Sequence, residues 1–157
     1  MLYRISLLGI LCLGALAAQK YSGPRPEKPD VPYLQHADTL IATEVSEATE
    51  EKRKEDIAYI VPGASSPVKT PLAGPIFLFQ ADKLSADKLQ LYRFEVKNGH
   101  REVFFSQKHK GSTRARRLNV TPVSGTLVRI EAAESLENGE YGLTPEGSNT
   151  VFCFQVY

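Results

Sequence analysis

Apolar and polar residues alternate on both sides of Asn98-Gly99, over residues 91–97 and 100–106. Asn-Gly is a favoured two-residue hairpin turn because both residues tolerate a positive φ. The pattern therefore predicts a hairpin in which Val96 lies opposite Arg101 and Lys97 lies opposite His100. One face of this hairpin is expected in the core, with Tyr92, Phe94, Val96, Val103 and Phe105. The other face is expected in water, with Arg93, Glu95, Lys97, His100 and Glu102.

Short apolar or β-branched runs continue along most of the chain and end at turn residues such as Ser124-Gly125 and Glu146-Gly147. They predict further strands at 39–45, 56–61, 75–80, 117–123, 126–132, 140–143 and 149–157. Residues 42–55 also have helix character, for which a charged hairpin tip is the alternative interpretation. Seven to nine short strands at this spacing indicate an antiparallel sandwich or a small barrel.

Residues 1–17 have the pattern of a cleaved signal peptide. Arg4 supplies a positive start, residues 5–13 are mostly apolar, and Ala15-Leu16-Ala17 matches a cleavage site. Because a stable membrane anchor needs about 20 apolar residues, we expect no transmembrane segment after cleavage. The protein is therefore expected to be exported, to the periplasm or out of the cell.

Residues 18–37 are rich in proline, with Pro24, Pro26, Pro29 and Pro32 interleaved with charged residues. Proline fixes φ and lacks a backbone donor, so this density favours an extended spacer over a helix or an internal strand. We therefore expect a spacer over 18–37 and one β-sandwich domain over 38–157.

The 157 residues are 42% hydrophobic and 24% charged, which is typical of one globular domain and not of a disordered chain. Cleavage of the leader would remove Arg4 and Cys12, leaving equal numbers of acidic and basic residues and one cysteine. A single cysteine excludes a disulfide scaffold and a Cys-based zinc site. Cys153 stands between Phe152 and Phe154, so we expect it to be a buried, small hydrophobic residue within a strand.

Leu136, Gly139 and Tyr141 form a Leu-x-x-Gly-x-Tyr segment before a predicted strand. This segment resembles the strand-entry turn of immunoglobulin-like and carboxypeptidase-regulatory-like sandwiches. The resemblance implies a tyrosine corner, in which the ring packs on the core and the hydroxyl bonds back to the preceding turn. Gly139 would allow the tight turn, and Leu136 would fill the end of the core. We therefore expect an immunoglobulin-like antiparallel β-sandwich.

The close of the chain, where Gly139-Glu140-Tyr141 leads to Val151-Phe152-Cys153-Phe154, is also similar to the ending of small exported bacterial proteins. This second resemblance implies a location and a fold, and it implies no activity.

The sequence carries no motif for catalysis or for binding a cofactor. His36 and Asp38 could place two metal ligands on one side of an extended segment, but no third ligand follows from the sequence. His100 lies beside a hairpin turn and His109 lies in a basic loop, where exposed polar surface explains both. We therefore expect a non-enzymatic protein with no metal and no cofactor.

Charge is segregated in the last third of the chain. Residues 103–130 contain six basic residues and no acidic one, whereas residues 131–157 contain five glutamates and no basic residue. Ion pairs between neighbouring strands would explain this pattern, and exposed pairs of that kind contribute only about 0–1 kcal/mol each. The functional interpretation is a binding site for an anionic polymer at a loop tip, made by Lys108, Lys110, Arg114, Arg116 and Arg117. Because this tip has no aromatic residue on which bases could stack, we do not expect nucleic acid as a partner.

Together these features predict an exported protein that acts by binding, or as a structural component, at the cell envelope. Its expected partner is an envelope protein or an acidic envelope polymer. A carbohydrate-binding module is the first alternative, although the chain contains no tryptophan to serve as a flat sugar platform. A hydrolase is the second alternative.

Overall fold

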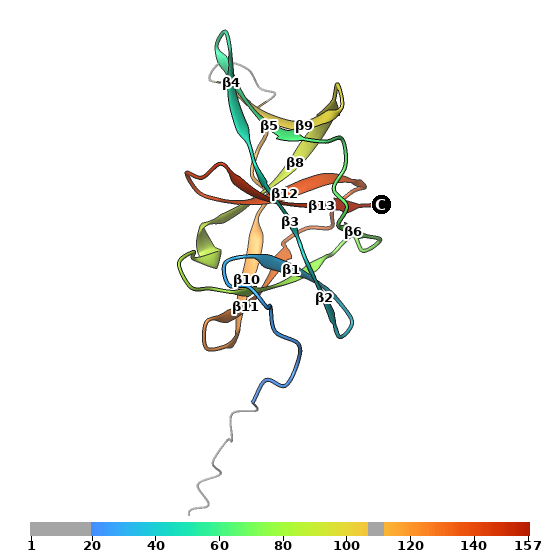
Figure 1. Ribbon diagram of the computed structural model, residues 1–157, viewed down its shortest axis with the longest axis vertical. Helices are drawn as coiled ribbons and strands as arrows, with labels where there is room; N and C mark the ends of the chain where they lie inside the picture. Colours follow the sequence, from blue (N-terminus) through green and yellow to red (C-terminus); the bar gives the residue numbers. More distant parts are fainter. Residues whose placement is uncertain (1–19, 107–111) are drawn as a thin grey trace, which may run out of the picture.

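Strands account for nearly all regular structure in the computed structural model, which describes residues 20–106 and 112–157 (Figure 1). The expected all-β antiparallel sandwich is confirmed, with thirteen strands in the described residues where seven to nine were expected. The leader predicted at 1–17 lies outside the described residues. Within the described part of the chain, no helix is long and apolar enough to cross a membrane. The immunoglobulin-like resemblance stays a prediction.

The first sheet has five strands in the order β10-β11-β7-β1-β2. In that order they span Leu118–Ser124, Leu127–Ala132, Ile76–Gln80, Pro32–His36 and Thr39–Ala42. Every pairing in this sheet is antiparallel. β10 carries Pro122, which lies beside a bulge on this edge strand, where a missing backbone donor is tolerated.

The second sheet has eight strands, of which seven follow the order β3-β13-β12-β8-β9-β5-β4. In that order they span Glu44–Glu47, Thr150–Val156, Gly139–Pro145, Leu89–Lys97, His100–Ser106, Asp56–Pro62 and Thr49–Arg53. The eighth strand, β6 (Lys69–Thr70), pairs in parallel with the end of β13. A short 3₁₀ helix, η1 (Ala86–Lys88), precedes β8.

The two ends of this second sheet are continuous in the chain, so its strand pairings close into a ring. β3 pairs with β13, and β4, which starts two residues after β3 ends, pairs with β5. Ala48, the residue between them, donates its N–H to the carbonyl of Asn149 at 2.8 Å. The chain from Glu44 to Arg53 therefore pairs first with β13 and then with β5. We call the closed set of β3/β4, β5, β9, β8, β12 and β13 the strand ring.

Strands β8 and β13 each serve two hydrophobic cores, and between them β12 supplies Tyr141 and Leu143 to the larger core. Successive side chains in a strand point to opposite faces. On β13, Phe152 and Phe154 pack in the larger core against the five-stranded sheet, whereas Val151 and Cys153 pack inside the strand ring. The same alternation on β8 places Leu91 in the larger core and Phe94 in the ring.

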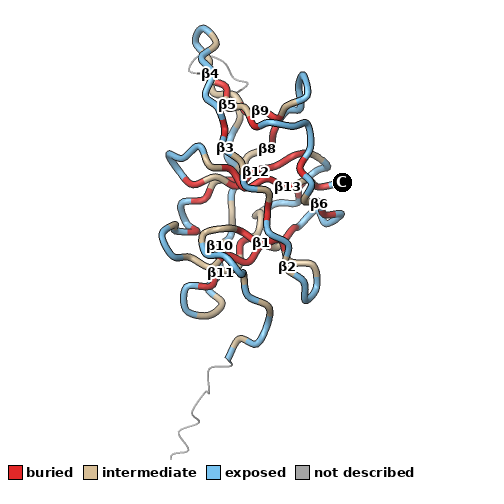
Figure 2. The backbone as a smooth tube through the Cα atoms, viewed as in Figure 1, coloured by how far each residue is buried: buried red, intermediate tan, exposed pale blue. Residues whose placement is uncertain are grey.

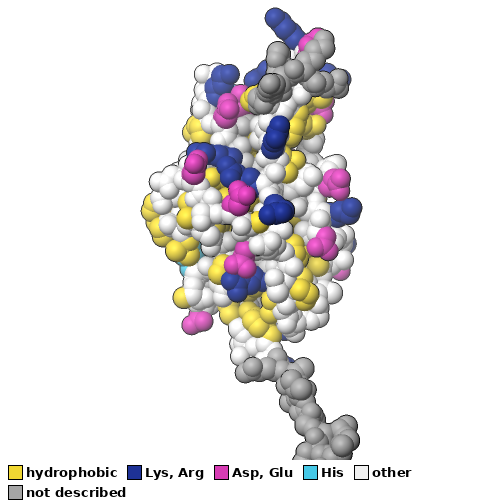
Figure 3. Space-filling model, turned by 180° about the vertical axis from the view of Figure 1, so that it is seen from behind, with side chains coloured by type: hydrophobic (Ala, Val, Ile, Leu, Met, Phe, Trp, Pro, Cys, Tyr) yellow, Lys and Arg dark blue, Asp and Glu magenta, His cyan; other side chains and the backbone are white. Residues whose placement is uncertain are grey.

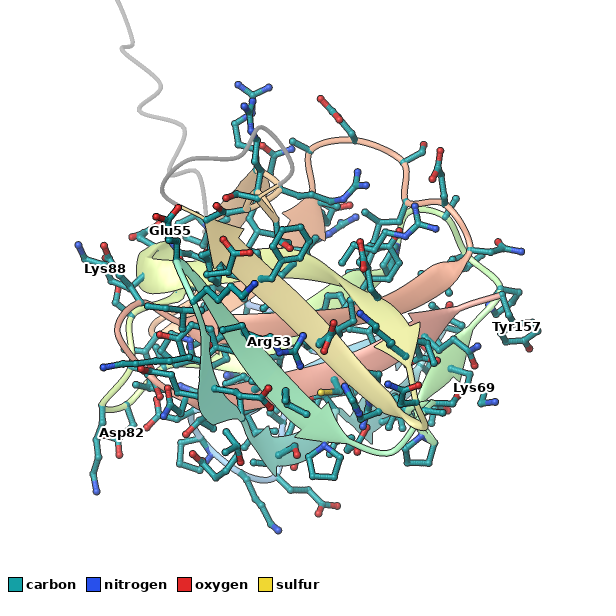
Figure 4. The ribbon with its side chains drawn as sticks, turned by 90° about the horizontal axis from the view of Figure 1, so that it is seen from above. Arg53, Glu55, Lys69, Asp82, Lys88 and Tyr157 are labelled. Atoms are coloured by element: carbon teal, nitrogen blue, oxygen red, sulfur yellow. The ribbon has the colours of Figure 1, made fainter. Side chains whose placement is uncertain are left out.

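The molecule is consequently built in three tiers. Figure 1 shows β4, β5 and β9 at the top, β12 and β13 in the middle, and β1, β2, β10 and β11 below. In Figure 2 buried positions run through the strands of the middle and lower tiers, and the hairpin tips are exposed. Figure 4 looks down on the top tier, where Arg53 lies over the strands.

The hairpin predicted around Asn98-Gly99 forms with the expected register, because Val96 pairs with Arg101 and Lys97 pairs with His100. Asn98 and Gly99 have φ values of 50° and 78°, as the turn requires. The assignment of its faces is wrong at two positions. Val96 is 54% exposed near the tip, and Glu102 is 3% exposed because ion pairs cover it.

The boundary of the domain predicted at residue 38 is also wrong. The last residues of the expected spacer form β1, where Tyr33 and Leu34 are buried between β2 and β7. The residues before β1 are held in place by Asp30, whose carboxylate accepts backbone N–H bonds from Asp82, Lys83 and Leu84 at 2.9–3.1 Å.

Residues 42–55 form no helix. The alternative of a charged hairpin tip is correct, because β4 and β5 pair through Arg53 and Asp56, and Lys54 takes a positive φ of 55° in the turn. Ala48 is buried in the strand ring, whereas residues 49–52 of β4 are all exposed.

Candidate functional site

Four arginines gather around one groove beside β8 and β12. The groove has a volume of about 590 Å³, and its described lining comprises Arg93, Ser112, Thr113, Arg114, Ala115, Arg116, Arg117, Ala132, Glu134 and Leu136. It includes three of the five basic residues predicted to bind an anionic polymer. The other two, Lys108 and Lys110, lie outside the described residues. The structure adds Arg93 to this basic set, although the sequence predicted only that Arg93 lies on the solvent-exposed face of the hairpin. We call this site the arginine groove.

Backbone hydrogen bonds fix the segment that carries these arginines. Thr113 donates its N–H to the carbonyl of Phe104 at 2.8 Å, and its hydroxyl accepts the N–H of the same residue at 3.1 Å. Three residues later, Arg116 donates its N–H to the carbonyl of Leu91 at 2.7 Å. The segment is therefore attached first to β9 and then to β8, so that its arginines project from an ordered backbone.

The three arginines of this segment have no acidic partner among the described residues. Arg114 and Arg117 are exposed. Arg116 is half-buried, and its guanidinium carbon lies 6.0 Å from the centre of the Tyr141 ring, at the distance of a cation–π contact. By contrast, Arg93 pairs with Glu137 at 2.6 Å, and Glu134 adds one negative charge to the lining. The ion pairs between strands that would explain the charge pattern do not form at Arg114, Arg116 or Arg117.

Tyr141 contacts the groove through Arg116. Its side chain is fully buried, its ring stacks on Phe154 with centroids 5.6 Å apart, and its hydroxyl donates to the carbonyl of Glu137 at 2.8 Å. This is the hydrogen bond to the preceding turn that the sequence predicts. Leu136 is buried in the same core and donates its N–H to the carbonyl of Ala73.

The reason for glycine at position 139 differs from the one expected. Gly139 is not among the residues with positive φ, so no left-handed turn requires it. A Cβ there would lie 2.9 Å from Nε of Arg93. Arg93 crosses directly over this backbone to reach Glu137 and the carbonyl of Asn138. Glycine therefore makes room for an arginine of the groove.

Cys153 is fully buried inside the strand ring, as expected. Burial raises the pKa of its thiol to about 12, although the neighbouring Arg101 opposes the change. A thiol in this environment stays protonated and is a poor nucleophile at neutral pH.

The predicted pair of His36 and Asp38 acquires no further ligand in the described residues. There, no group of three or more His, Cys, Asp and Glu side chains is arranged to hold a metal ion. His36 ends β1, and Asp38 lies in the turn that leads to β2.

Comparisons of this chain with protein-family models, with curated proteins and with solved structures find no match.

Proposed function

We propose that this protein is an exported, non-enzymatic binding protein that holds an acidic envelope polymer in its arginine groove. The observation that supports the proposal is that Arg114, Arg116 and Arg117 lie on one ordered segment without an acidic partner in the described residues. Arg93 extends the same surface from β8.

The chemistry of the groove fits carboxylate, sulfate or phosphate groups. A guanidinium group presents two parallel N–H donors that match two oxygens of such an anion. Elsewhere, the surface mixes both signs of charge, as Figure 3 shows for the face opposite to that of Figure 1. Binding through a few arginines on such a surface is weak, and it fades with salt because the Debye length is about 8 Å at physiological ionic strength.

Chromatography on immobilised heparin and on immobilised lipopolysaccharide tests this proposal. Wild-type protein is expected to be retained at low salt and released as salt rises. Replacing Arg114, Arg116 and Arg117 with Ser is expected to abolish retention with little change in melting temperature.

A matched control removes the same charge elsewhere, by replacing the exposed residues Lys52, Lys69 and Lys83 with Ser. Retention of this control shows that the site, and not net charge, is responsible. If wild type elutes in the low-salt wash, or if both triple variants lose retention equally, the proposal is wrong. Retention on a neutral polysaccharide column would favour the carbohydrate-binding alternative.

A further inference from the structure

A second cavity opens at one end of the strand ring, on the other face of β8 from the arginine groove. Its volume is about 330 Å³, and its lining includes four aromatic rings, which belong to Tyr59, Tyr92, Phe94 and Phe105. Ala48, Val103 and Val151 complete an apolar floor. This size is at the lower end of the range for small-molecule sites.

Contacts among the rings hold the aromatic wall in shape. Phe105 meets Tyr59 and Tyr92 in edge arrangements, with centroids 5.8 Å and 5.7 Å apart. Both tyrosine hydroxyls act as donors to side chains of the same lining. Tyr59 donates to Oε2 of Glu50 at 3.3 Å, and Tyr92 donates to Oε1 of Gln90 at 2.9 Å.

The charge of the cavity is negative. Glu50 is its one charged lining residue within the described chain, where no Lys, Arg or His lines it. Burial and then the charge of Glu146 raise the pKa of the Tyr92 hydroxyl, although Glu146 also pairs with Lys88 at 3.5 Å. Likewise, burial and then Glu50 raise the pKa of Tyr59. A cation is therefore favoured beside Glu50, whose carboxylate lines the cavity next to the Tyr59 hydroxyl.

We propose that this cavity binds a small organic cation of the methylated ammonium class. Aromatic faces attract such a cation through their quadrupoles, most strongly where water is excluded, and a carboxylate at the rim adds Coulombic attraction. A fully methylated, quaternary ammonium such as that of choline has no N–H to donate, so it suits a wall of rings better than a primary amine or a metal ion does. The proposal concerns a site separate from the arginine groove and does not depend on it.

Titration with choline, followed by amide NMR and calorimetry on the full chain, tests this assignment. The comparison ligand is 3,3-dimethylbutan-1-ol, which has the same shape without the charge. Choline is expected to bind about tenfold more tightly, which corresponds to a cation–π contribution of about 1.4 kcal/mol. The amide shifts are expected to cluster at Gly142, Ser148 and Asn149, which line the cavity.

Glu50→Gln removes the rim charge from an exposed side chain, so folding is not at risk, and it is expected to weaken choline binding several-fold. Glu95→Gln is the matched control, because Glu95 is exposed on β8 and does not line this cavity. Tyr92→Leu removes a ring and is expected to abolish the preference for choline over its neutral isostere, with a melting curve to verify folding.

The proposal would be overturned by the absence of saturable choline binding, by equal affinity for the neutral isostere, or by amide shifts away from the cavity. Equal weakening by Glu50→Gln and Glu95→Gln would also overturn it, because the attraction would then come from net charge alone. Tight binding of a neutral monosaccharide such as glucose, without binding of choline, would replace the cation with a sugar as ligand.

Discussion

Arg101 and Glu44 form a two-pronged ion pair inside the strand ring, with Nη1–Oε2 at 2.8 Å and Nη2–Oε1 at 2.9 Å. The same guanidinium donates to the carbonyls of Pro62 and Gly63, and its Nη1 lies 3.8 Å from the buried carboxylate of Glu140. On the strands of the ring, these residues lie at the end opposite to the aromatic cavity. A charged cluster thus closes one end of the ring, and the other end stays open.

Replacing Arg101 with Met should be among the most damaging substitutions in the ring. The change leaves Glu44 and Glu140 without their cation, and breaking a buried pair in this way costs about 3–5 kcal/mol. Urea unfolding measures the loss. Lys88→Gln breaks an exposed pair with Glu146 and should leave the urea midpoint nearly unchanged. Equal effects of the two variants would contradict a closed, low-dielectric ring end.

Acid should destabilise the protein through Glu44 and Glu102. Burial alone would raise the pKa of Glu44, but hydrogen bonds from Arg101 and Ser66 outweigh it and lower that pKa below its usual 4.5. A hydrogen bond from Arg53 is the main cause that lowers the pKa of Glu102. Both carboxylates bind protons more weakly in the folded state than in the unfolded state. Their contribution to the free energy of unfolding is therefore fully present above the pKa of the unfolded state, and it is lost as pH falls through the pKa of the folded state.

Urea melts between pH 7 and pH 2 test this dependence. The midpoint should fall with acid below about pH 4.5. Glu102→Gln should flatten the fall, whereas Glu95→Gln on the same hairpin should not. A midpoint that stays constant to pH 2 would exclude a role for these carboxylates.

Tyr141→Phe should lower the free energy of unfolding by about 0.5–1.5 kcal/mol, because the hydroxyl no longer donates to the carbonyl of Glu137. Tyr157→Phe is the matched control, since Tyr157 is 59% exposed at the end of the chain. The stability of both variants can be compared by urea unfolding. A loss within experimental error for Tyr141→Phe would mean that water replaces the hydroxyl without cost.

Cys153 should resist alkylation in the folded protein. Burial blocks access, and a pKa of about 12 leaves almost no thiolate at pH 8. Iodoacetamide should label the thiol slowly in buffer and quickly in 6 M urea, as mass spectrometry can follow. Fast labelling in buffer, or a disulfide-linked dimer on a non-reducing gel, would instead indicate an accessible thiol.

Gly142→Ala should destabilise the protein by about 1–3 kcal/mol through overpacking. A Cβ at Gly142 would lie 2.5 Å from Cγ1 of Val151 and 2.7 Å from Cε2 of Phe94. Gly74→Ala is the control, because a Cβ at Gly74 meets no atom within 4 Å. Melting temperatures of the two variants should separate clearly, and similar values would show that the Phe94 ring moves aside freely.

Local patterns predicted the local structure well. Asn98-Gly99 specifies its hairpin through backbone freedom alone, so the register followed from two residues. The contact of the Tyr141 hydroxyl with the preceding turn spans four residues, and it too was accessible from the sequence. Most strand positions followed from apolar runs or alternation, but β4, which has no buried residue, carries charges that gave its segment helix character.

Partnerships over long distances in sequence were not predictable in the same way. Arg101 reads as a polar residue near a hairpin tip, and its burial depends on Glu44, which lies 57 positions earlier in the chain. The rings of the aromatic cavity come from three strands, β5, β8 and β9, so the alternation at Tyr92 and Phe94 predicted only a core. The prolines before β1 likewise concealed a strand that pairs with β2 and β7 and buries Leu34 in the larger core.

The shared middle strands restrict how this chain can change in length. A one-residue insertion in β8, β12 or β13 would turn every later side chain of that strand to the opposite face. Phe154 and Cys153 would then exchange surroundings, and two cores would be lost through one event. The outer strand β10 faces one core only and already absorbs an irregularity between Pro122 and Ser124. Lineages descended from this chain should therefore accumulate insertions and deletions in its outer strands and turns, while the three middle strands keep a constant length.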